Sequence, residues 1–233
     1  MAYRSPSKSA GAAPRIRDLF RPPGPRLFFV HTPKCGGKYV EHALGWRLRL
    51  SPPLRWRDMR GHLTFREYER VLRDHGERIA DYLTLSVVRN PWDWHLSFYT
   101  YVRNDAGGRR SGHPALHEAF SRRSFRDHIL GIDEFAAGYP ADHPLNRNLV
   151  DWVLGADGTV AVDRLLRQET LVDDLRAFVT ALGIRARIDP TRRINASRSA
   201  RERDYRTHYD DRMVEIVARR HQRDQALLGY RFA

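Results

Sequence analysis

The apolar positions of the chain fall into short continuous runs, each followed by a stretch of helical period. Leu27–Val30 is a continuous apolar run, and Leu83–Val88 is apolar except for Thr84 and Ser86. Both stop at proline-containing segments, as expected for buried parallel strands. Apolar residues at helical spacing follow each run: Val40, Ala43 and Leu44 after the first, and Trp94, Phe98, Tyr101 and Val102 after the second. The same order, a strand, a loop and a helix, is therefore predicted twice.

The C-terminal half continues this alternation. Residues 162 to 166 predict a third strand, and a helix is predicted from Leu171 to Leu182 with Gly183 as its C-terminal cap. A final helical stretch is expected over 205–228. Strands that alternate with helices predict an α/β fold, a single domain with a mainly parallel central sheet flanked by helices. A length of 233 residues, 41% of them hydrophobic, suits one domain with a sizeable core.

Three segments lack such periodicity. Residues 1–25 are rich in Ser, Ala, Pro, Gly and Arg and are predicted to be a flexible basic leader before a folded domain at 26–233. The polar stretches 104–114 and 138–145 are long enough to be acceptor-site or lid loops.

The charge and the cysteine content of the chain indicate which partners and which compartment to expect. The formal net charge of +13 predicts attraction to anionic partners without choosing among a nucleotide, an acidic sugar and nucleic acid. Nearly all of this charge is arginine, and two of the three lysines, Lys34 and Lys38, lie within five residues. Cys35 is the only cysteine, and no apolar run approaches the roughly 20 residues that span a bilayer, so we expect a cytoplasmic protein without a membrane partner.

The first candidate motif is the loop after the first strand, residues 31 to 40. Its glycines, Gly36 and Gly37, allow a ligand to approach the backbone, and the N–H groups that open the next helix form an anion site to which Lys34 and Lys38 add charge. A phosphate-like ligand is predicted. A Walker A loop requires glycine at position 32 and a serine or threonine at position 39, and this chain has Thr32 and Tyr39.

This segment resembles the H-x-P-K-T-G-G-T-S signature of the sulfotransferase family, in which a P-loop-like turn binds 3′-phosphoadenosine 5′-phosphosulfate (PAPS). His31, Pro33, Lys34, Gly36 and Gly37 match. Cys35 replaces the usual threonine, and Lys38 and Tyr39 replace a Thr-Ser pair. The resemblance implies cofactor contacts at Pro33, Lys34, Cys35, Gly36, Gly37, Lys38 and Tyr39.

The second candidate motif, residues 88 to 101, resembles the 3′-phosphate motif of that family, R-[DN]-P-x-x-R-x-x-S-x-Y. Arg89, Pro91, Ser97 and Tyr99 match, and Trp94 stands in place of the middle arginine. Arg89 follows a strand and Ser97 lies two turns into the next helix, so both can face one phosphate. The resemblance implies that they bind the 3′-phosphate and so select PAPS over ATP.

The resemblance also implies a catalytic base and a late cofactor loop. His62, within residues 60–65, matches a G-H-x-x-F-like segment that supplies the catalytic histidine of several carbohydrate sulfotransferases, and histidine suits a base near neutral pH. Residues 168–183 and 195–230 resemble the C-terminal region of the family, which makes Ser197 and Arg198 expected cofactor contacts. His113 and His117 have a metal-compatible spacing, but Pro114 lies between them, so no metal is expected.

The expected activity is therefore transfer of a sulfuryl group from PAPS to an acceptor hydroxyl, with release of adenosine 3′,5′-bisphosphate. Lys34 is expected to stabilise the transferred group and His62 to accept the hydroxyl proton. The resemblance is nearest to carbohydrate O-sulfotransferases, and Arg109 and Arg110 suit an acidic saccharide, although a lipid, a peptide or a small natural product is compatible too. Two alternatives stay open: a basic nucleic-acid-binding protein, and an ATP-dependent kinase that would need magnesium.

Overall fold

A computed structural model describes residues 24–45, 48, 57–59, 61–104, 114–191 and 204–233. Three parallel strands form one sheet in the order β1-β2-β3. They are β1 (Leu27–Val30), β2 (Leu83–Val88) and β3 (Arg164–Arg167). In the pairing register Leu27 lies opposite Leu83, and Leu85 lies opposite Arg164. The predicted α/β fold with a parallel sheet flanked by helices is confirmed at this level.

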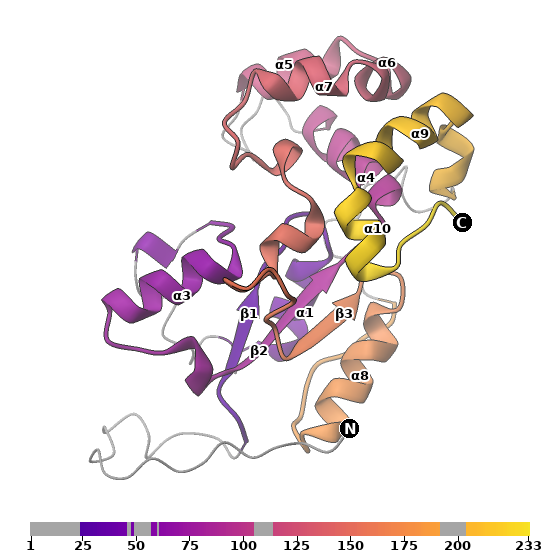
Figure 1. The fold of residues 1–233 in the computed structure, drawn as a ribbon. Coiled ribbons are helices and arrows are strands. Elements are labelled where there is room, and N and C mark those ends of the chain that lie inside the picture. The colour runs from indigo at the N-terminus through magenta and orange to yellow at the C-terminus, as the bar shows by residue number, and fades with distance from the viewer. Residues whose placement is uncertain (1–23, 46–47, 49–56, 60, 105–113, 192–203) are drawn as a thin grey trace.

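Helices surround the small sheet, and several 3-10 turns connect them. The helices are α1 (Gly37–Leu44), α3 (Phe65–Asp74), α4 (Pro91–Arg103), α5 (Pro114–Ser121), α6 (Phe125–Leu130), α7 (Ile132–Ala137), α8 (Leu171–Ala181), α9 (Asp211–Arg220) and α10 (Gln222–Leu228). The 3-10 turns are η3 (Arg57–Met59), η4 (Ile79–Asp81), η6 (Pro144–Asn146), η7 (Leu149–Trp152) and η9 (Tyr205–His208). Figure 1 shows α4 to α7 and α9 gathered above the sheet, with α3 on one side of it and α8 on the other.

Each face of the sheet is buried because successive side chains of a strand point to opposite faces. Leu27, Leu85 and Leu166 belong to one core cluster, packed with side chains of α1, α4 and α8. The opposite face carries Phe28 and Val88, which belong to a second cluster with side chains of α3, η7 and α10. This burial on both faces explains why β1 reads as a continuous apolar run in the sequence and why β2 carries only small polar side chains, Thr84 and Ser86, between its apolar ones.

The first two strands have the predicted bounds, and α4 begins at Pro91, as predicted, after the Asn90 side chain accepts a hydrogen bond from the Trp92 N–H. The third strand is shifted to Arg164–Arg167. The final stretch is not one helix. Asp210 caps the start of α9, and the helix is interrupted at His221 before α10 begins. The His221 ring is hydrogen-bonded to the buried carboxylate of Asp224, and this contact fixes the interruption.

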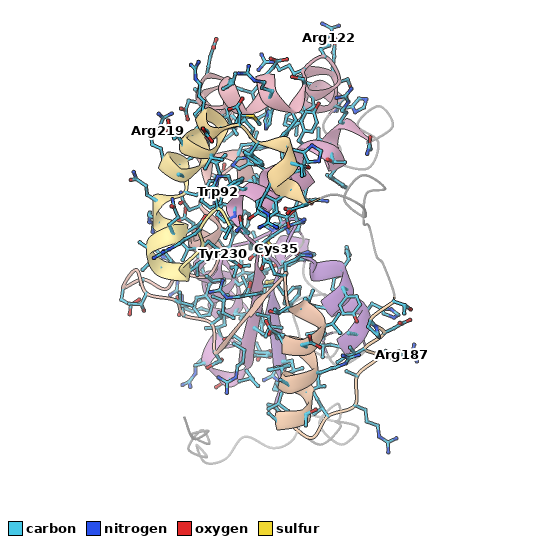
Figure 2. The ribbon with its side chains drawn as sticks, turned by 90° about the vertical axis from the view of Figure 1, so that its right-hand side faces the viewer. Cys35, Trp92, Arg122, Arg187, Arg219 and Tyr230 are labelled. Atoms are coloured by element: carbon cyan, nitrogen blue, oxygen red, sulfur yellow. The ribbon has the colours of Figure 1, made fainter. Side chains whose placement is uncertain are left out.

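Several predicted segments lie outside the described residues, namely most of the leader, most of the loop at 104–114, and Ser197 with Arg198. Among the helices that the structure does describe, none has the length and apolar character needed to cross a membrane. Arginine side chains such as Arg122 and Arg219 extend outward from the periphery, whereas Cys35 and Tyr230 lie in the middle of the molecule (Figure 2).

Candidate active site

The loop between β1 and α1 has a backbone that depends on its two glycines. Gly36 adopts a φ of 84°, and a Cβ atom there would lie 2.8 Å from Leu171 Cδ2. A Cβ atom on Gly37 would lie 2.2 Å from His31 Nε2. Lys34 itself has a positive φ of 61°, which costs free energy for a residue with a side chain. The loop is therefore tightly wound, and its shape is set by local steric constraints.

Four carbonyl groups of this loop accept hydrogen bonds, whereas the N–H groups of residues 34–38 donate none within the described chain. His31 O accepts from His62 Nδ1 at 2.8 Å, Pro33 O from Trp94 Nε1 at 2.9 Å, and Lys34 O from Arg89 Nη1 at 3.0 Å. Gly36 O accepts from the N–H groups of α1. Across the part of the chain that the structure describes, the N–H groups of residues 34–38 have no protein acceptor. Consecutive free N–H groups at the start of a helix form an anion-binding site.

Lys34 lies at the centre of this site. Its amine lies 3.8 Å from the centre of the Tyr101 ring, a cation–π contact between the loop and α4. Burial and the nearby Arg89 lower the pKa of Lys34 to about 8. The amine is still mostly protonated at neutral pH, and an anion bound beside it would favour the charged form further.

Arg89 joins the two predicted motifs. It follows β2 directly, its Nε donates to Asp93 at 2.7 Å, and its Nη1 reaches the carbonyl of Lys34. Its side chain is 11% exposed, so the guanidinium is held largely out of water beside the loop. The carboxyl ends of two adjacent parallel strands therefore bring Lys34 and Arg89 together.

Ser97 lies on the face of α4 that carries two residues in contact with the loop. Trp94 and Tyr101 both contact the loop, and Ser97 lies one turn from each of them, on the same face of the helix. Tyr99, by contrast, is buried in the core, and its hydroxyl donates to Arg123 O at 2.6 Å. The serine of the second motif is thus placed toward the first motif, whereas the tyrosine is structural.

Three residues of the first motif face elsewhere. Cys35 is fully buried, burial raises the pKa of its thiol, and its Sγ lies 3.3 Å from Pro33 O. Tyr39 is also buried and donates its hydroxyl hydrogen to Asp189 O at 2.9 Å. Lys38 is exposed and pairs with Glu41 at 2.7 Å. Through their backbones Cys35 and Lys38 still contribute free N–H groups, whereas the Tyr39 N–H donates to Gly36 O.

His62 contacts the loop at its first residue, His31. Its Nδ1 must carry the hydrogen donated to the carbonyl of His31, so the lone pair of a neutral ring is on Nε2. The ring lies edge-on to His31, with 4.6 Å between the ring centres, and it keeps an edge open to solvent. Partial burial of the ring and the neighbouring His31 lower the pKa of His62. A neutral imidazole with a free Nε2 has the form that a general base requires.

Sequence reasoning missed several residues around the site. Glu41 accepts from both His31 and Lys38, and these contacts lower its pKa to about 2. Arg147 lies with its guanidinium carbon 5.0 Å from the Trp152 ring centre and pairs with Glu67 at 3.1 Å. The T-x-x-E spacing that makes Glu67 part of a capping box with Thr64 was a readable signal, but nothing in the local sequence indicated Arg147.

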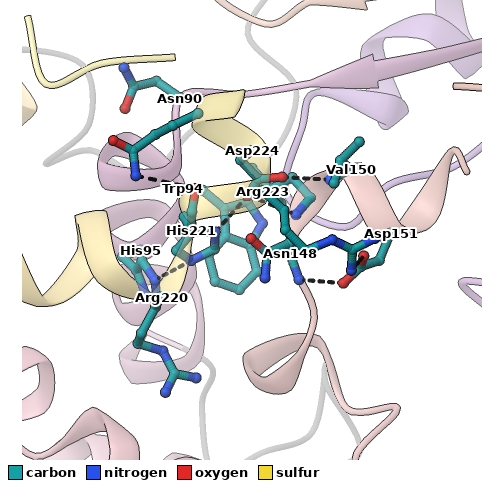
Figure 3. A network of polar contacts seen from close by, with 12 residues as sticks. Asn90, Trp94, His95, Asn148, Val150, Asp151, Arg220, His221, Arg223 and Asp224 are labelled. Carbon is teal, nitrogen blue, oxygen red and sulfur yellow. Dashed lines mark hydrogen bonds and ion pairs between the residues drawn. The ribbon is translucent and has the colours of Figure 1, made fainter. Parts of the chain in front are cut away.

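A buried polar network supports α4 from behind (Figure 3). Asp224, with no exposed surface, accepts from the N–H groups of Leu149 and Val150 and from His221 Nδ1 at 2.6 Å. His221 Nε2 lies 2.9 Å from His95 Nε2 on α4. Burial lowers the pKa of His95 well below its usual value. The network ties α10, η7 and α4 together beneath Trp94.

In the part of the chain described by the structure, no group of three or more histidine, cysteine, aspartate or glutamate side chains is arranged to hold a metal ion. Comparison with protein-family models, with curated proteins and with solved structures finds no match to this chain.

Proposed function

We propose that the chain is a PAPS-dependent sulfotransferase with a P-loop-like fold, which transfers a sulfuryl group to an acceptor hydroxyl. The observation that carries the proposal is the run of free N–H groups at residues 34–38, beside the Lys34 amine and Arg89, in a loop that other side chains hold by its carbonyls. This arrangement suits a phosphate or sulfate group. The choice of PAPS among anions rests on the resemblance of both motifs to the sulfotransferase family.

In the proposed reaction the acceptor oxygen forms a bond to sulfur while the bond from sulfur to the bridging phosphate oxygen breaks. The electron pair stays on that phosphate oxygen, which leaves adenosine 3′,5′-bisphosphate. His62 Nε2 takes the proton of the acceptor hydroxyl. Lys34 and the free N–H groups stabilise the negative charge that develops on the leaving oxygen, in the way that fixed donors stabilise charge in phosphoryl transfer.

Arg89 and Ser97 are assigned to the 3′-phosphate in this proposal. Both lie beside the loop, and a guanidinium held largely out of water gives strong, directional hydrogen bonds to phosphate oxygens. Loss of the 3′-phosphate from the nucleotide should therefore weaken binding.

A thermal-shift titration tests the cofactor directly, because a ligand that binds only the folded protein raises its melting temperature. Adenosine 3′,5′-bisphosphate should give a saturable shift in the absence of magnesium, AMP and ATP should give smaller ones, and Arg89→Ala should lose the preference. His62→Ala should keep the shift but lose sulfuryl transfer. An equal shift for every polyanion would favour a basic nucleic-acid-binding protein, and a requirement for magnesium would favour a kinase.

A further inference from the structure

A small polar hollow lies between η6 and the junction of α9 and α10, separate from the loop at residues 34–38. Its volume is about 270 Å³, and it is open to solvent. The residues around it are Leu145, Asn146, Arg147, Asn148, Arg220 and His221. These lining residues, all within the described ranges, include two arginines and no carboxylate. Figure 3 shows His221 of this wall bonded to the buried Asp224, with the Arg220 side chain extending away from Asp224.

The two arginines are held in place and are only 15% and 17% exposed. Arg147 packs over Trp152 and pairs with Glu67, whose other oxygen accepts from the Thr64 N–H. Arg220 donates to Leu145 O at 2.7 Å and pairs with Asp133. Because these partners fix the guanidinium groups before any ligand arrives, little side-chain entropy remains to be lost on binding.

The charged side chains that line the hollow itself are Arg147 and Arg220. Their carboxylate partners, Glu67 and Asp133, lie outside this lining, as does the buried Asp224 behind His221. A ligand in the hollow therefore meets the two guanidinium groups first. His221 forms the inner wall with both ring nitrogens already bonded, and Asn146 has its Nδ2 bound to three backbone carbonyls, which leaves its Oδ1 as an acceptor.

We propose that this hollow binds a carboxylate or sulfate group carried by a small hydroxyl-bearing ligand. Fixed guanidinium groups recognise the anion, and the carboxamides of Asn146 and Asn148 suit neighbouring hydroxyls. The buried Trp152 packs against Arg147 of the hollow on one side and lies near His62 on another, with 6.3 Å between the Trp152 and His62 ring centres. The further step, that the ligand is the acceptor and is anionic, rests on the function proposed above. The proposal that the hollow binds an anion does not depend on that function.

Isothermal titration calorimetry of the full chain with D-glucuronate, inorganic sulfate and neutral D-glucose tests the site. Glucuronate should bind saturably and glucose should not. Asn148→Asp keeps a good N-terminal cap for η7 and places a negative charge in the wall, so it should weaken glucuronate binding about tenfold or more. Arg147→Gln should weaken glucuronate binding by a similar factor. It serves as the test variant if Asn148→Asp fails to fold. Arg122 is an exposed arginine paired with Glu118, so Arg122→Ala is the matched control. This variant should bind glucuronate as the unmodified chain does.

Two results would overturn the proposal: binding of glucuronate and glucose with equal affinity, or anion binding that is unaffected by Asn148→Asp and Arg147→Gln. Sulfate can also bind the loop at residues 34–38, and Lys34→Ala separates the two sites. If all anion binding is lost in Lys34→Ala alone, the hollow is not a site. A chain that binds glucuronate but shows no response to adenosine 3′,5′-bisphosphate would keep the hollow and refute the proposed cofactor.

Discussion

The side-chain amine of Lys34 lies 3.8 Å from the centre of the Tyr101 ring. An aromatic face stabilises an ammonium group by about 0.5–2 kcal/mol, much less than a bound anion would in the same surroundings. The contact therefore holds the amine beside the loop without neutralising it. Tyr101 lies outside the matched positions of the second motif, so its part in the site became visible only in the structure.

Chemical labelling should report this environment. Because burial and Arg89 lower the pKa of Lys34 to about 8, acylation of its amine should reach half of its maximal rate near pH 8, against about 10.4 for an ordinary lysine. Arg89→Ala removes one cause and should raise the midpoint. Mass spectrometry of the labelled peptides gives the rates, and with three lysines in the chain the sites are easily separated. A midpoint above pH 10 in the unmodified chain would contradict the described environment.

Gly37 and His31 should be energetically coupled. A methyl group at position 37 would overlap the His31 ring, so Gly37→Ala should lower the free energy of unfolding by about 1–3 kcal/mol. In a His31→Ala background the obstacle is absent, and the same substitution should cost little. Urea unfolding of the four proteins in a double-mutant cycle measures the coupling. Simple additivity would show that the contact does not constrain position 37.

The buried carboxylate of Asp224 should matter far more to stability than an exposed one. Asp224→Asn disturbs three hydrogen bonds that have no water to replace them, and we expect a loss of about 2–4 kcal/mol in unfolding free energy. Asp133→Asn is the matched control: its side chain is 57% exposed although it pairs with two arginines, so a loss of about 1 kcal/mol or less is expected. Equal losses in thermal unfolding would refute the structural role of the network.

Acid should destabilise the fold through buried histidines. Burial and the charges of Arg123 and Arg220 lower the pKa of His128 to about 3, and its Nε2 has no partner in the described part of the chain. The unfolded chain therefore binds a proton that the folded chain rejects as pH falls from about 6.5 towards 3, so stability is lost over that range.

At pH 5 this effect amounts to about 2 kcal/mol for His128, and His95 acts in the same direction. His128→Phe, which places a ring among Phe120, Tyr99 and Phe135, should reduce the pH dependence by about that amount. Urea unfolding at pH 7.5, 6.0 and 5.0 provides the comparison. An unchanged slope would mean that His128 is not the titrating group.

Strands β1 and β2 were predictable because strands buried on both faces are mostly apolar, and α4 was predictable because Asn90 and Pro91 mark a helix start. The bounds of β3 were less clear, because arginines begin and end it. Helices α5 to α7 were not predicted, since each is eight residues or fewer and carries little periodicity. The proximity of Lys34 to Arg89 could be anticipated from the topology of adjacent parallel strands. The positions of Arg147, Trp152 and Asp224 could not, because they depend on how distant segments pack above the sheet.

The role of Trp94, which departs from the resembling motif, could not be predicted from the sequence. It stands where the resembling motif has an arginine, which reads in the sequence as a lost phosphate ligand. In the structure its indole N–H donates to Pro33 O, and its ring stacks on Phe98 with 5.0 Å between the ring centres. Trp94 therefore stabilises the loop through its hydrogen bond to Pro33 O.

The engaged carbonyls of the loop have a kinetic consequence. Since His62, Trp94 and Arg89 already hold three carbonyl oxygens of the loop, its backbone is fixed before a ligand arrives, and no slow ordering step has to accompany ligand binding. Association with an anionic ligand should then proceed at a rate set by diffusion and by the attraction of a chain with a net charge of +13. Raising the ionic strength would slow the arrival of such a ligand far more than its departure.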